Sequence, residues 1–294
     1  MTVRSLLGQA LRHDGINFVL TNRIPRRLAT LLVGWLSRIE QPVVRDVSIA
    51  VWRFFADVDL SDAKKSRFSS MHDCFTRELK EGARAIDTNA GVLVSPCDAI
   101  VGASGVLDGA TVIQAKGFSY SLDELLTDAT LARDYRDGAF VTLRLTSGMY
   151  HRFHAPHDCR LEKVTYVAGD AWNVNPSALA RVANLYCKNE RAILQTRLSV
   201  SDYVIVLVPV AAVLVASIRL AKIDVRLHLR HRGPNVIRSD ATFAKGEELG
   251  WFEQGSTIIV FAPKGFALHE RVHQGAIIRM GQPLMRLPAD RGFG

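Results

Sequence analysis

The stretch Trp251-Phe-Glu-Gln-Gly-Ser-Thr-Ile-Ile-Val-Phe-Ala-Pro263 sets a tight Gly255-Ser256-Thr257 step between two apolar runs. The residues after Thr257 are β-branched or aromatic until Pro263 ends the run, so the pattern predicts a turn that leads into a β-strand. A Gly-Ser-Thr step is by itself ordinary turn chemistry. Any further role for Ser256 therefore depends on partners supplied by the rest of the chain.

The composition is that of a folded protein. The chain has 294 residues, of which 48% are hydrophobic and 22% charged, enough for one large or two modest domains with a core. Its four cysteines are scattered without a CxxC pair or a nearby set of histidine ligands, so no metal site is expected. Such sparse cysteine favours a reducing compartment.

Positive charge is concentrated near the N-terminus. The net charge is +8, and residues 1–55 carry eight arginines against three acidic residues. Two helices are predicted in this segment, at residues 26–38 and from Val44 to Phe55, because apolar side chains recur there at the spacing of one helical face. Neither is long enough to span a bilayer. Packing on a core and lying in a membrane interface both fit these helices.

From residue 91 the chain changes to short β-like runs separated by Gly, Pro and Asp. Two short helices are expected, at residues 75–79 and around 121–127, where Ser121 and Glu124 have the spacing of a capping box.

The predicted fold class is α+β. The apolar run 203–218 is too short and too rich in valine for a membrane span, so two buried strands joined near Pro209 are predicted. The last 50 residues are similar to the hairpins of biotinyl- and lipoyl-type domains. We expect a basic amphipathic helical region, residues 1–85, and a β-rich domain, residues 86–294, with a barrel-sandwich hybrid core.

Two further stretches can supply partners for Ser256. Tyr150-His-Arg-Phe-His-Ala-Pro156 holds His151 and His154, which face opposite sides of an extended chain. Asp98, which follows an apolar strand, has the residue type that orients the histidine of a serine triad. The ordinary alternatives are histidines satisfied at a strand end and a carboxylate that forms a turn.

A serine, a histidine and an aspartate together make an activated nucleophile. A hydrolase of this kind usually carries a Gly-x-Ser-x-Gly elbow between a strand and a helix, and the surroundings of Ser256 do not match it. A serine held against its own preceding peptide bond suggests attack on the carbonyl of Gly255, which has no side chain to block the approach.

Several short motifs occur in a definite order over nearly the whole chain. They are Phe75-Thr-Arg-Glu-Leu79, Ile86-Asp-Thr88, Val94-Ser-Pro-Cys-Asp98, Gln114-Ala-Lys-Gly117, Tyr120-Ser-Leu122, Tyr150–Pro156, Asn189-Glu-Arg191, Gly255-Ser-Thr257 and Phe261-Ala-Pro263. With this ordered set the chain resembles the phosphatidylserine decarboxylases, a family of pyruvoyl-dependent membrane enzymes.

The resemblance implies self-processing by Asp98, His154 and Ser256. His154 takes the proton of Ser256 while Asp98 holds the imidazole, and the serine Oγ attacks the Gly255 carbonyl to form an ester. β-Elimination releases a β chain, residues 1–255, and leaves dehydroalanine, which hydrolyses to a pyruvoyl group with loss of ammonia. The α chain, residues 256–294, is expected to stay in place within the β domain.

The resemblance also implies the reaction, the decarboxylation of phosphatidylserine to phosphatidylethanolamine. The pyruvoyl cofactor, made from Ser256, forms a Schiff base with the substrate amine and takes up the electrons released as carbon dioxide leaves. His151 assists decarboxylation or reprotonates the carbon. Val174 and Asn175, in the loop Gly169–Pro176, line the substrate site.

The partners implied are a phospholipid substrate and an anionic membrane surface, without nucleic acid, and the two cleavage chains stay associated, with a homodimer as one allowed assembly. The resemblance places the protein at the cytoplasmic face of the inner membrane as a peripheral protein. The chain departs from the family pattern at two places. It has Cys97-Asp98-Ala99 where the family usually has Ala-Asp-Gly, and Gln254 where Leu is more common, and both bear on the rate of processing.

Three alternatives remain open at this point. The same three residues could serve a serine hydrolase that acts on an external ester, or the pyruvoyl chemistry could act on another amine-bearing acid. The chain could instead be a non-catalytic, membrane-bound β scaffold. A hydrolase and a scaffold both predict an intact chain, and the scaffold further predicts that Ser256→Ala changes nothing.

Overall fold

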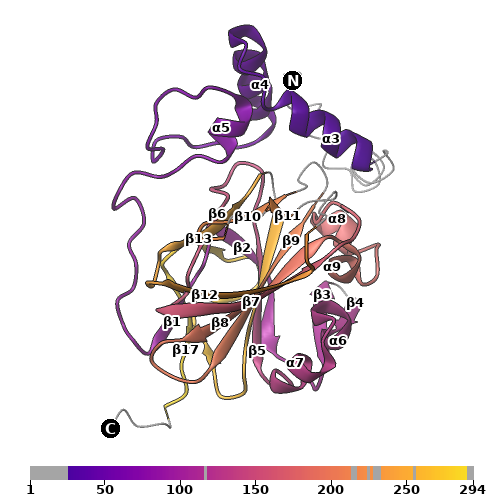
Figure 1. Cartoon of the computed structure of the whole chain (residues 1–294), viewed down its shortest axis with the longest axis vertical. Helices are drawn as coiled ribbons and strands as arrows, with labels where there is room; N and C mark the ends of the chain where they lie inside the picture. Colours follow the sequence, from indigo (N-terminus) through magenta and orange to yellow (C-terminus); the bar gives the residue numbers. More distant parts are fainter. Residues whose placement is uncertain are drawn as a thin grey trace.

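The computed structural model describes residues 26–115, 118–212, 217–223, 226–227, 233–253 and 256–289. The predicted cleavage partner Gly255 and its neighbour Gln254 lie outside these residues. Figure 1 shows the helices of the described N-terminal residues gathered at one end of the molecule and a sheet-rich body below them. The chain is therefore an α+β protein dominated by sheets, as the sequence predicts.

The N-terminal helices are α3 (Arg26–Leu36), α4 (Pro42–Phe55) and α5 (Met71–Phe75). The first two confirm the helices predicted from periodicity. The helix predicted at 75–79 is wrong, because the helical turn precedes this segment. The hydroxyl of Ser70 caps the backbone N–H of Asp73 at 3.1 Å, and the helix has ended before Leu79 forms an isolated bridge with Ala63.

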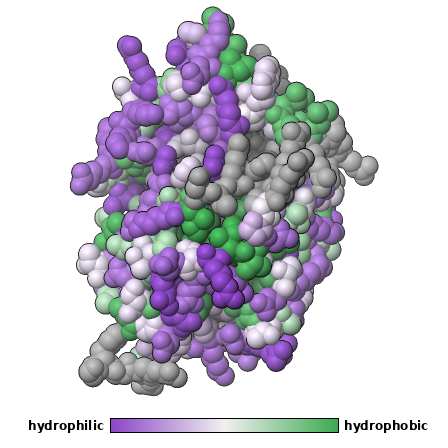
Figure 2. Space-filling view, in the orientation of Figure 1, coloured by the Kyte–Doolittle hydropathy of each residue, from purple (hydrophilic) through white to green (hydrophobic). Residues whose placement is uncertain are grey.

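The apolar side chains of α3 and α4 point mainly outward. Trp35 is 67% exposed and Phe55 60% exposed, whereas the polar Thr30 and Ser37 are buried. Of α4, Trp52 is buried, and it packs with Cys74 and Phe75 of α5. Figure 2 shows hydrophobic surface at the end of the molecule that carries these helices. The helical end thus exposes the kind of side chain that a globular protein normally buries.

The body is built around one eight-stranded antiparallel sheet. Its order is β12 (Val236–Phe243), β7 (Cys159–Val167), β8 (Arg191–Leu198), β9 (Val204–Ala211), β14 (Ser256–Ala262), β5 (Ala139–Arg144), β2 (Ala99–Val106) and β16 (Ile277–Ile278). All seven residues of β14 are buried between β9 and β5. The strand that begins with Ser256 is therefore an interior strand of the sheet.

Smaller sheets and short helices cover the two faces of this sheet. The sheets are β11 (Arg226–Leu227) with β10 (Ile218–Leu220), β13 (Glu248–Phe252) and β6 (Arg152–His154); β1 (Val92–Val94) with β17 (Pro283–Arg286) and β15 (Ala267–Leu268); and β3 (Thr111–Ala115) with β4 (Phe118–Ser121). The helices are α6 (Leu122–Leu126), α7 (Ala129–Asp134), α8 (Pro176–Leu179) and α9 (Leu185–Lys188).

Alternation along β14 divides the core into two layers. Ile258 and Val260 belong to the cluster shared with β6, β10, β13 and β17, whereas Ile259 and Phe261 pack with the helices α6 to α9. Successive side chains of a strand point to opposite faces, so a strand covered on both faces is apolar without a break. This explains the unbroken apolar run after Thr257.

Two details of the sequence prediction need correction. Pro209 lies inside β9 and does not separate two strands, and the register of β9 with β8 steps from Leu207 to Val210, past the residue that has no N–H to donate. Ser121 stands at the N-cap of α6 as predicted, but its side chain makes no capping bond, and Glu124 accepts instead from Asn184 at 2.8 Å.

Candidate active site

Ser256 is fixed at the start of β14. Its carbonyl oxygen accepts from the backbone N–H of Leu145 at 2.9 Å, and on the other side it lies opposite Ala211 of β9. The residue is fully buried, and its Oγ has no hydrogen-bond partner among the described residues. A buried hydroxyl without a partner costs stability, so its retention points to a role outside the fold.

A cavity of about 370 Å³ opens beside Ser256. One part of its wall is polar and consists of Arg144, Thr146, Ser147, Asn173, Asn175 and Ser256 itself. Another part is apolar and comes from the helical end of the molecule, with Val33, Trp52, Met71 and Phe75. The cavity therefore offers polar surface next to the serine and apolar surface next to the exposed helices.

The loop that carries the predicted residues Val174 and Asn175 lines this same cavity. The Asn175 side chain accepts from the backbone N–H of Ala178 at 2.8 Å, which caps α8. The loop is anchored by Asn189, whose amide donates to the carbonyls of Trp172 and Ala211 at 2.9 and 2.8 Å. The structure thus brings both predicted residues to the wall that holds Ser256.

His151 lies one aromatic ring behind the cavity wall. Its ring stacks on Phe75 with centroids 4.0 Å apart, and Phe75 lines the cavity. Nδ1 faces the carbonyl of Met149 at 2.8 Å and must carry the proton there, which leaves Nε2 as a buried lone pair without a partner among the described residues. Burial, together with the charge of Arg77, lowers the pKa of His151 to about 3.

His154 has both ring nitrogens occupied. Nδ1 donates to the carbonyl of Gly246 at 2.9 Å, and Nε2 accepts from the hydroxyl of Tyr150 at 3.0 Å. Burial lowers its pKa to about 4, although the bond to Gly246 opposes the shift. His154 is therefore a neutral imidazole held in one tautomer.

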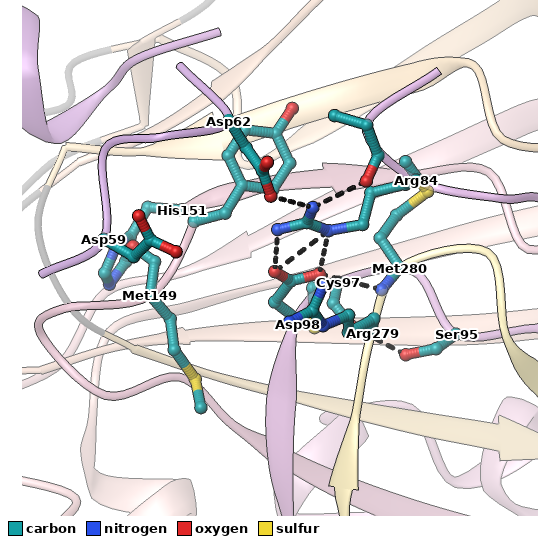
Figure 3. A network of polar contacts seen from close by, with 12 residues as sticks. Asp59, Asp62, Arg84, Ser95, Cys97, Asp98, Met149, His151, Arg279 and Met280 are labelled. Atoms are coloured by element: carbon teal, nitrogen blue, oxygen red, sulfur yellow. Dashed lines mark hydrogen bonds and ion pairs between the residues drawn. The ribbon is translucent and has the colours of Figure 1, made fainter. Parts of the chain in front are cut away.

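Asp98 is held by a cation rather than by a histidine. Arg84 Nη2 lies 2.6 Å from Asp98 Oδ2, and the backbone N–H of Met280 donates to Oδ1 at 2.9 Å. Figure 3 shows the guanidinium of Arg84 facing both Asp98 and Asp62, the latter at 2.8 Å. The carboxylate is thus fixed by charge-assisted bonds within a network of several residues.

Asp98 and His154 are neighbours in this arrangement, whereas Ser256 lines the cavity of about 370 Å³. The backbone N–H of His154 donates to the carbonyl of Pro96 at 2.8 Å, and a cavity of about 280 Å³ is lined by Arg84, Tyr150 and His154. No hydrogen bond joins His154 to Asp98 or to Ser256 among the described residues. The three predicted triad members are therefore not joined by hydrogen bonds in this structure, and the cavities lined by Ser256 and by His154 share no described lining residue.

Four residues that shape these regions do not stand out in the sequence. Arg84 lies outside the predicted elements and motifs, and Tyr150 and Asn189 occur in the motifs without an assigned role. Arg144 ends an ordinary strand pattern. A partial signal existed only for Arg144, since a charged residue at the end of an apolar strand is unusual when that end is covered.

The sequence of this chain is similar to those of known proteins. A sequence profile of phosphatidylserine decarboxylase matches residues 71–286. The phosphatidylserine decarboxylase proenzyme of Myxococcus xanthus is 35% identical over 266 residues, covering 88% of this chain and 94% of that protein. That of Vibrio cholerae is 36% identical over 286 residues, with 92% and 98% covered.

The fold and the site define an α+β protein with a buried, unpaired serine at the head of a central strand. The chain belongs to the phosphatidylserine decarboxylase family. Within the part of the chain that the structure describes, no helix combines the length and the apolar character that crossing a membrane demands.

Proposed function

We propose that the chain is a proenzyme that converts itself into a phosphatidylserine decarboxylase, a carboxy-lyase that yields phosphatidylethanolamine. The observation that carries the proposal is the position of Ser256, whose buried and unpaired Oγ lies at the polar wall of a cavity with an apolar second wall. A phospholipid likewise has a polar head group and apolar chains. The reaction itself is inferred from membership of the family.

The first reaction is self-cleavage between Gly255 and Ser256, with Asp98 and His154 in support. Ser256 Oγ attacks the Gly255 carbonyl, and the resulting ester eliminates to give chains of residues 1–255 and 256–294. His154 is neutral and can accept the serine proton at Nε2. For this step, the hydrogen bond from the Tyr150 hydroxyl to Nε2 must be replaced by one from Ser256 Oγ. Asp98 compensates the positive charge that His154 then carries.

The residues at the cavity fit a pyruvoyl group derived from Ser256. The Oγ has no partner to lose, so conversion of the serine breaks no hydrogen bond of the described residues. A pyruvoyl ketone supplies an electrophilic electron sink for decarboxylation. His151, with a neutral ring and a free Nε2 behind Phe75, holds or moves the proton of the reacting carbon. Val174 and Asn175 line the part of the cavity that would receive the head group.

The exposed apolar faces of α3 and α4 are proposed to lie on the cytoplasmic face of an anionic inner membrane. Both helices supply residues to the cavity, Val33 and Trp52, so a lipid reaching the cavity from the bilayer would pass along them. The arginines of residues 1–55 would add attraction to anionic lipids.

The division into regions 1–85 and 86–294, the barrel-sandwich likeness and a homodimer stay predictions.

Mass spectrometry of the purified protein under denaturing conditions tests the function most directly. We expect two masses, one for residues 1–255 and one for residues 256–294 with a blocked N-terminus, and release of carbon dioxide from phosphatidylserine in vesicles. Ser256→Ala should give one intact chain without activity. An intact wild-type chain that releases carbon dioxide would refute the self-cleavage, and a cleaved chain that leaves phosphatidylserine unchanged would refute the substrate.

A further inference from the structure

Arg144 lies at the wall of the Ser256 cavity and has no partner for its positive charge among the described residues. It ends β5 directly opposite Thr257, the residue that follows Ser256 on β14. Its guanidinium makes no hydrogen bond or ion pair with any residue that the structure describes. Burial lowers the pKa of Arg144 from its ordinary value, and the phenol of Tyr186 opposes this shift.

Three other arginines that reach into the body have several partners each. Arg191 donates to the backbone carbonyls of Glu124, Leu125, Cys187 and Asn189. Arg84 is bound by two carboxylates, and Arg152 lies 2.8 Å from Glu248. A partly buried guanidinium is costly when it has neither a counter-charge nor hydrogen-bond acceptors, so Arg144, which has neither among the described residues, calls for an anion that comes from outside the chain.

The surroundings of Arg144 suit an anionic ligand. None of the described residues that line the 370 Å³ cavity is acidic, and the polar ones, Ser147, Asn173 and Asn175 among them, carry neutral hydrogen-bonding groups. Arg144 also lines a second cavity of about 390 Å³. A ligand whose reacting end meets Ser256 would have its next polar group within the same enclosure.

Resting on the proposed function, we infer that Arg144 binds the phosphodiester of the phospholipid substrate and so selects a phosphorylated head group over a free amino acid. Arginine is suited to this task because its planar fork can donate two parallel hydrogen bonds to phosphate oxygens. Other amine-bearing acids, which have no phosphodiester, are therefore expected to bind weakly.

The substrate carboxylate is the wrong anion for this position. Decarboxylation moves the negative charge out of the carboxylate, so a cation bound there would stabilise the ground state more than the transition state. The phosphodiester keeps its charge through the reaction. A cation bound to it stabilises substrate, transition state and product alike, which lowers KM and leaves kcat unchanged.

The test compares wild type, Arg144→Gln and Arg144→Lys, all as the cleaved enzyme, on a short-chain soluble phosphatidylserine. Arg136→Gln, which removes an exposed arginine with the same change of charge, is the control. We expect Arg144→Gln to raise KM roughly ten- to hundredfold with kcat nearly unchanged, because a hydrogen bond to a charged group is lost. Arg144→Lys should recover part of the affinity as a point charge.

Two inhibitors distinguish the phosphodiester from the carboxylate. Glycerophosphoethanolamine has the phosphodiester but no carboxylate, and free serine has the carboxylate but no phosphodiester. We expect Arg144→Gln to weaken inhibition by the first by the same factor as KM and to leave inhibition by serine unchanged. An unaltered KM, or a loss of serine inhibition alone, would overturn the assignment.

Folding and function are controlled separately. The fraction of cleaved chain and the melting temperature report whether each Arg144 variant has folded, and Arg144→Lys, which keeps the charge, provides a second measurement if the glutamine variant unfolds. A wild-type enzyme that releases no carbon dioxide would contradict the proposed function itself. An active wild type whose variants show wild-type KM would contradict only the role of Arg144.

Discussion

Arg38 and Glu253, which are 215 positions apart in the chain, form an ion pair of 2.7 Å between the helical end and the strand that leads to Ser256. Glu253 follows directly on β13 and also accepts a bond from the hydroxyl of Ser217. Arg38 follows α3, and the carbonyl of Ser37 accepts from the backbone N–H of His72 at 2.8 Å. The end of β13, three residues before the proposed cleavage site, is thus tied to the helices.

We therefore predict that Glu253→Gln slows self-cleavage roughly fivefold, which corresponds to about 1 kcal/mol in the barrier. The amide keeps the shape but loses the charge that holds Arg38, so the segment before Ser256 is positioned less firmly. The measurement is the time course of the 39-residue fragment, residues 256–294, on a denaturing gel after synthesis. Glu162→Gln, which breaks a pair of the same 2.7 Å length with Arg197, should cleave at the wild-type rate.

Ser256→Ala should abolish cleavage without weakening the fold. Because Oγ has no hydrogen-bond partner among the described residues, its removal breaks no bond and ends the burial of an unsatisfied group. We expect the free energy of unfolding to stay within about 1 kcal/mol of that of the uncleaved parent, measured by urea titration. A clear loss of stability would show that the hydroxyl has a structural partner.

Stability should fall in mild acid because two buried histidines resist protonation. The pKa values of His151 and His154 are lowered to about 3 and 4, whereas an unfolded histidine titrates near about 6.5. Below that pH the unfolded chain binds more protons than the folded one. Each histidine therefore removes about 1.4 kcal/mol of stability per pH unit until its folded pKa is reached.

Urea unfolding of Ser256→Ala at pH 7.5, 6.5 and 5.5 measures this slope on an uncut chain. Adding His151→Gln should reduce the slope by about one proton, and adding His273→Gln, at an exposed position, should leave it unchanged. Equal slopes for the two double variants would mean that the His151 ring is not held neutral by the fold.

Asp98→Asn should cost about 2 kcal/mol of stability and slow self-cleavage, because Arg84 loses its closest counter-charge in a partly buried site. The backbone N–H of Met280 keeps an acceptor in the asparagine oxygen, so the turn itself survives. Asp62→Asn removes the other, more exposed partner of Arg84 and should cost under about 1 kcal/mol. Thermal unfolding and the cleavage assay together would reveal whether the two aspartates differ as expected.

Membrane attachment should depend on the outward side chains of α3 and α4. We predict that Trp35→Glu combined with Phe55→Glu lowers binding to vesicles containing an anionic lipid by at least about tenfold, since two large apolar groups no longer enter the interface. Ile277→Glu, at a position 73% exposed on β16, is the matched control. Co-sedimentation with vesicles measures the effect, and equal loss in both variants would exclude α3 and α4 as the specific contact.

The positions of the strands and the two long helices could be predicted because they depend on local patterns. Alternation and helical spacing are properties of neighbouring residues, and β14 and α4 appear where the sequence placed them. The direction in which α3 turns its apolar face could not be predicted in this way. Periodicity shows which residues share a face, and only packing decides whether Leu28 and Trp35 or Thr30 and Ser37 are buried.

The residues proposed to react could be named from motifs, but their surroundings could not. Asp98, His154 and Ser256 stand in short recognisable stretches, whereas the cation that holds Asp98 comes from Arg84, 14 positions earlier and outside any periodic element. Long-range pairs such as Arg38 with Glu253 leave no trace in a single sequence. The hydrogen bond that occupies His154 Nε2 also depends on a tautomer, which only the three-dimensional neighbours determine.

The position of β14 has a consequence for refolding after the protein has been unfolded. Cleavage before Ser256 would make an interior strand, paired to β9 and β5 along its length, the first segment of a separate short chain. If heat or denaturant then released that chain, reassembly would require two molecules to meet instead of one chain to fold on itself. The cleaved enzyme would then depend on the height of its unfolding barrier for protection, because the chain is continuous only before self-cleavage.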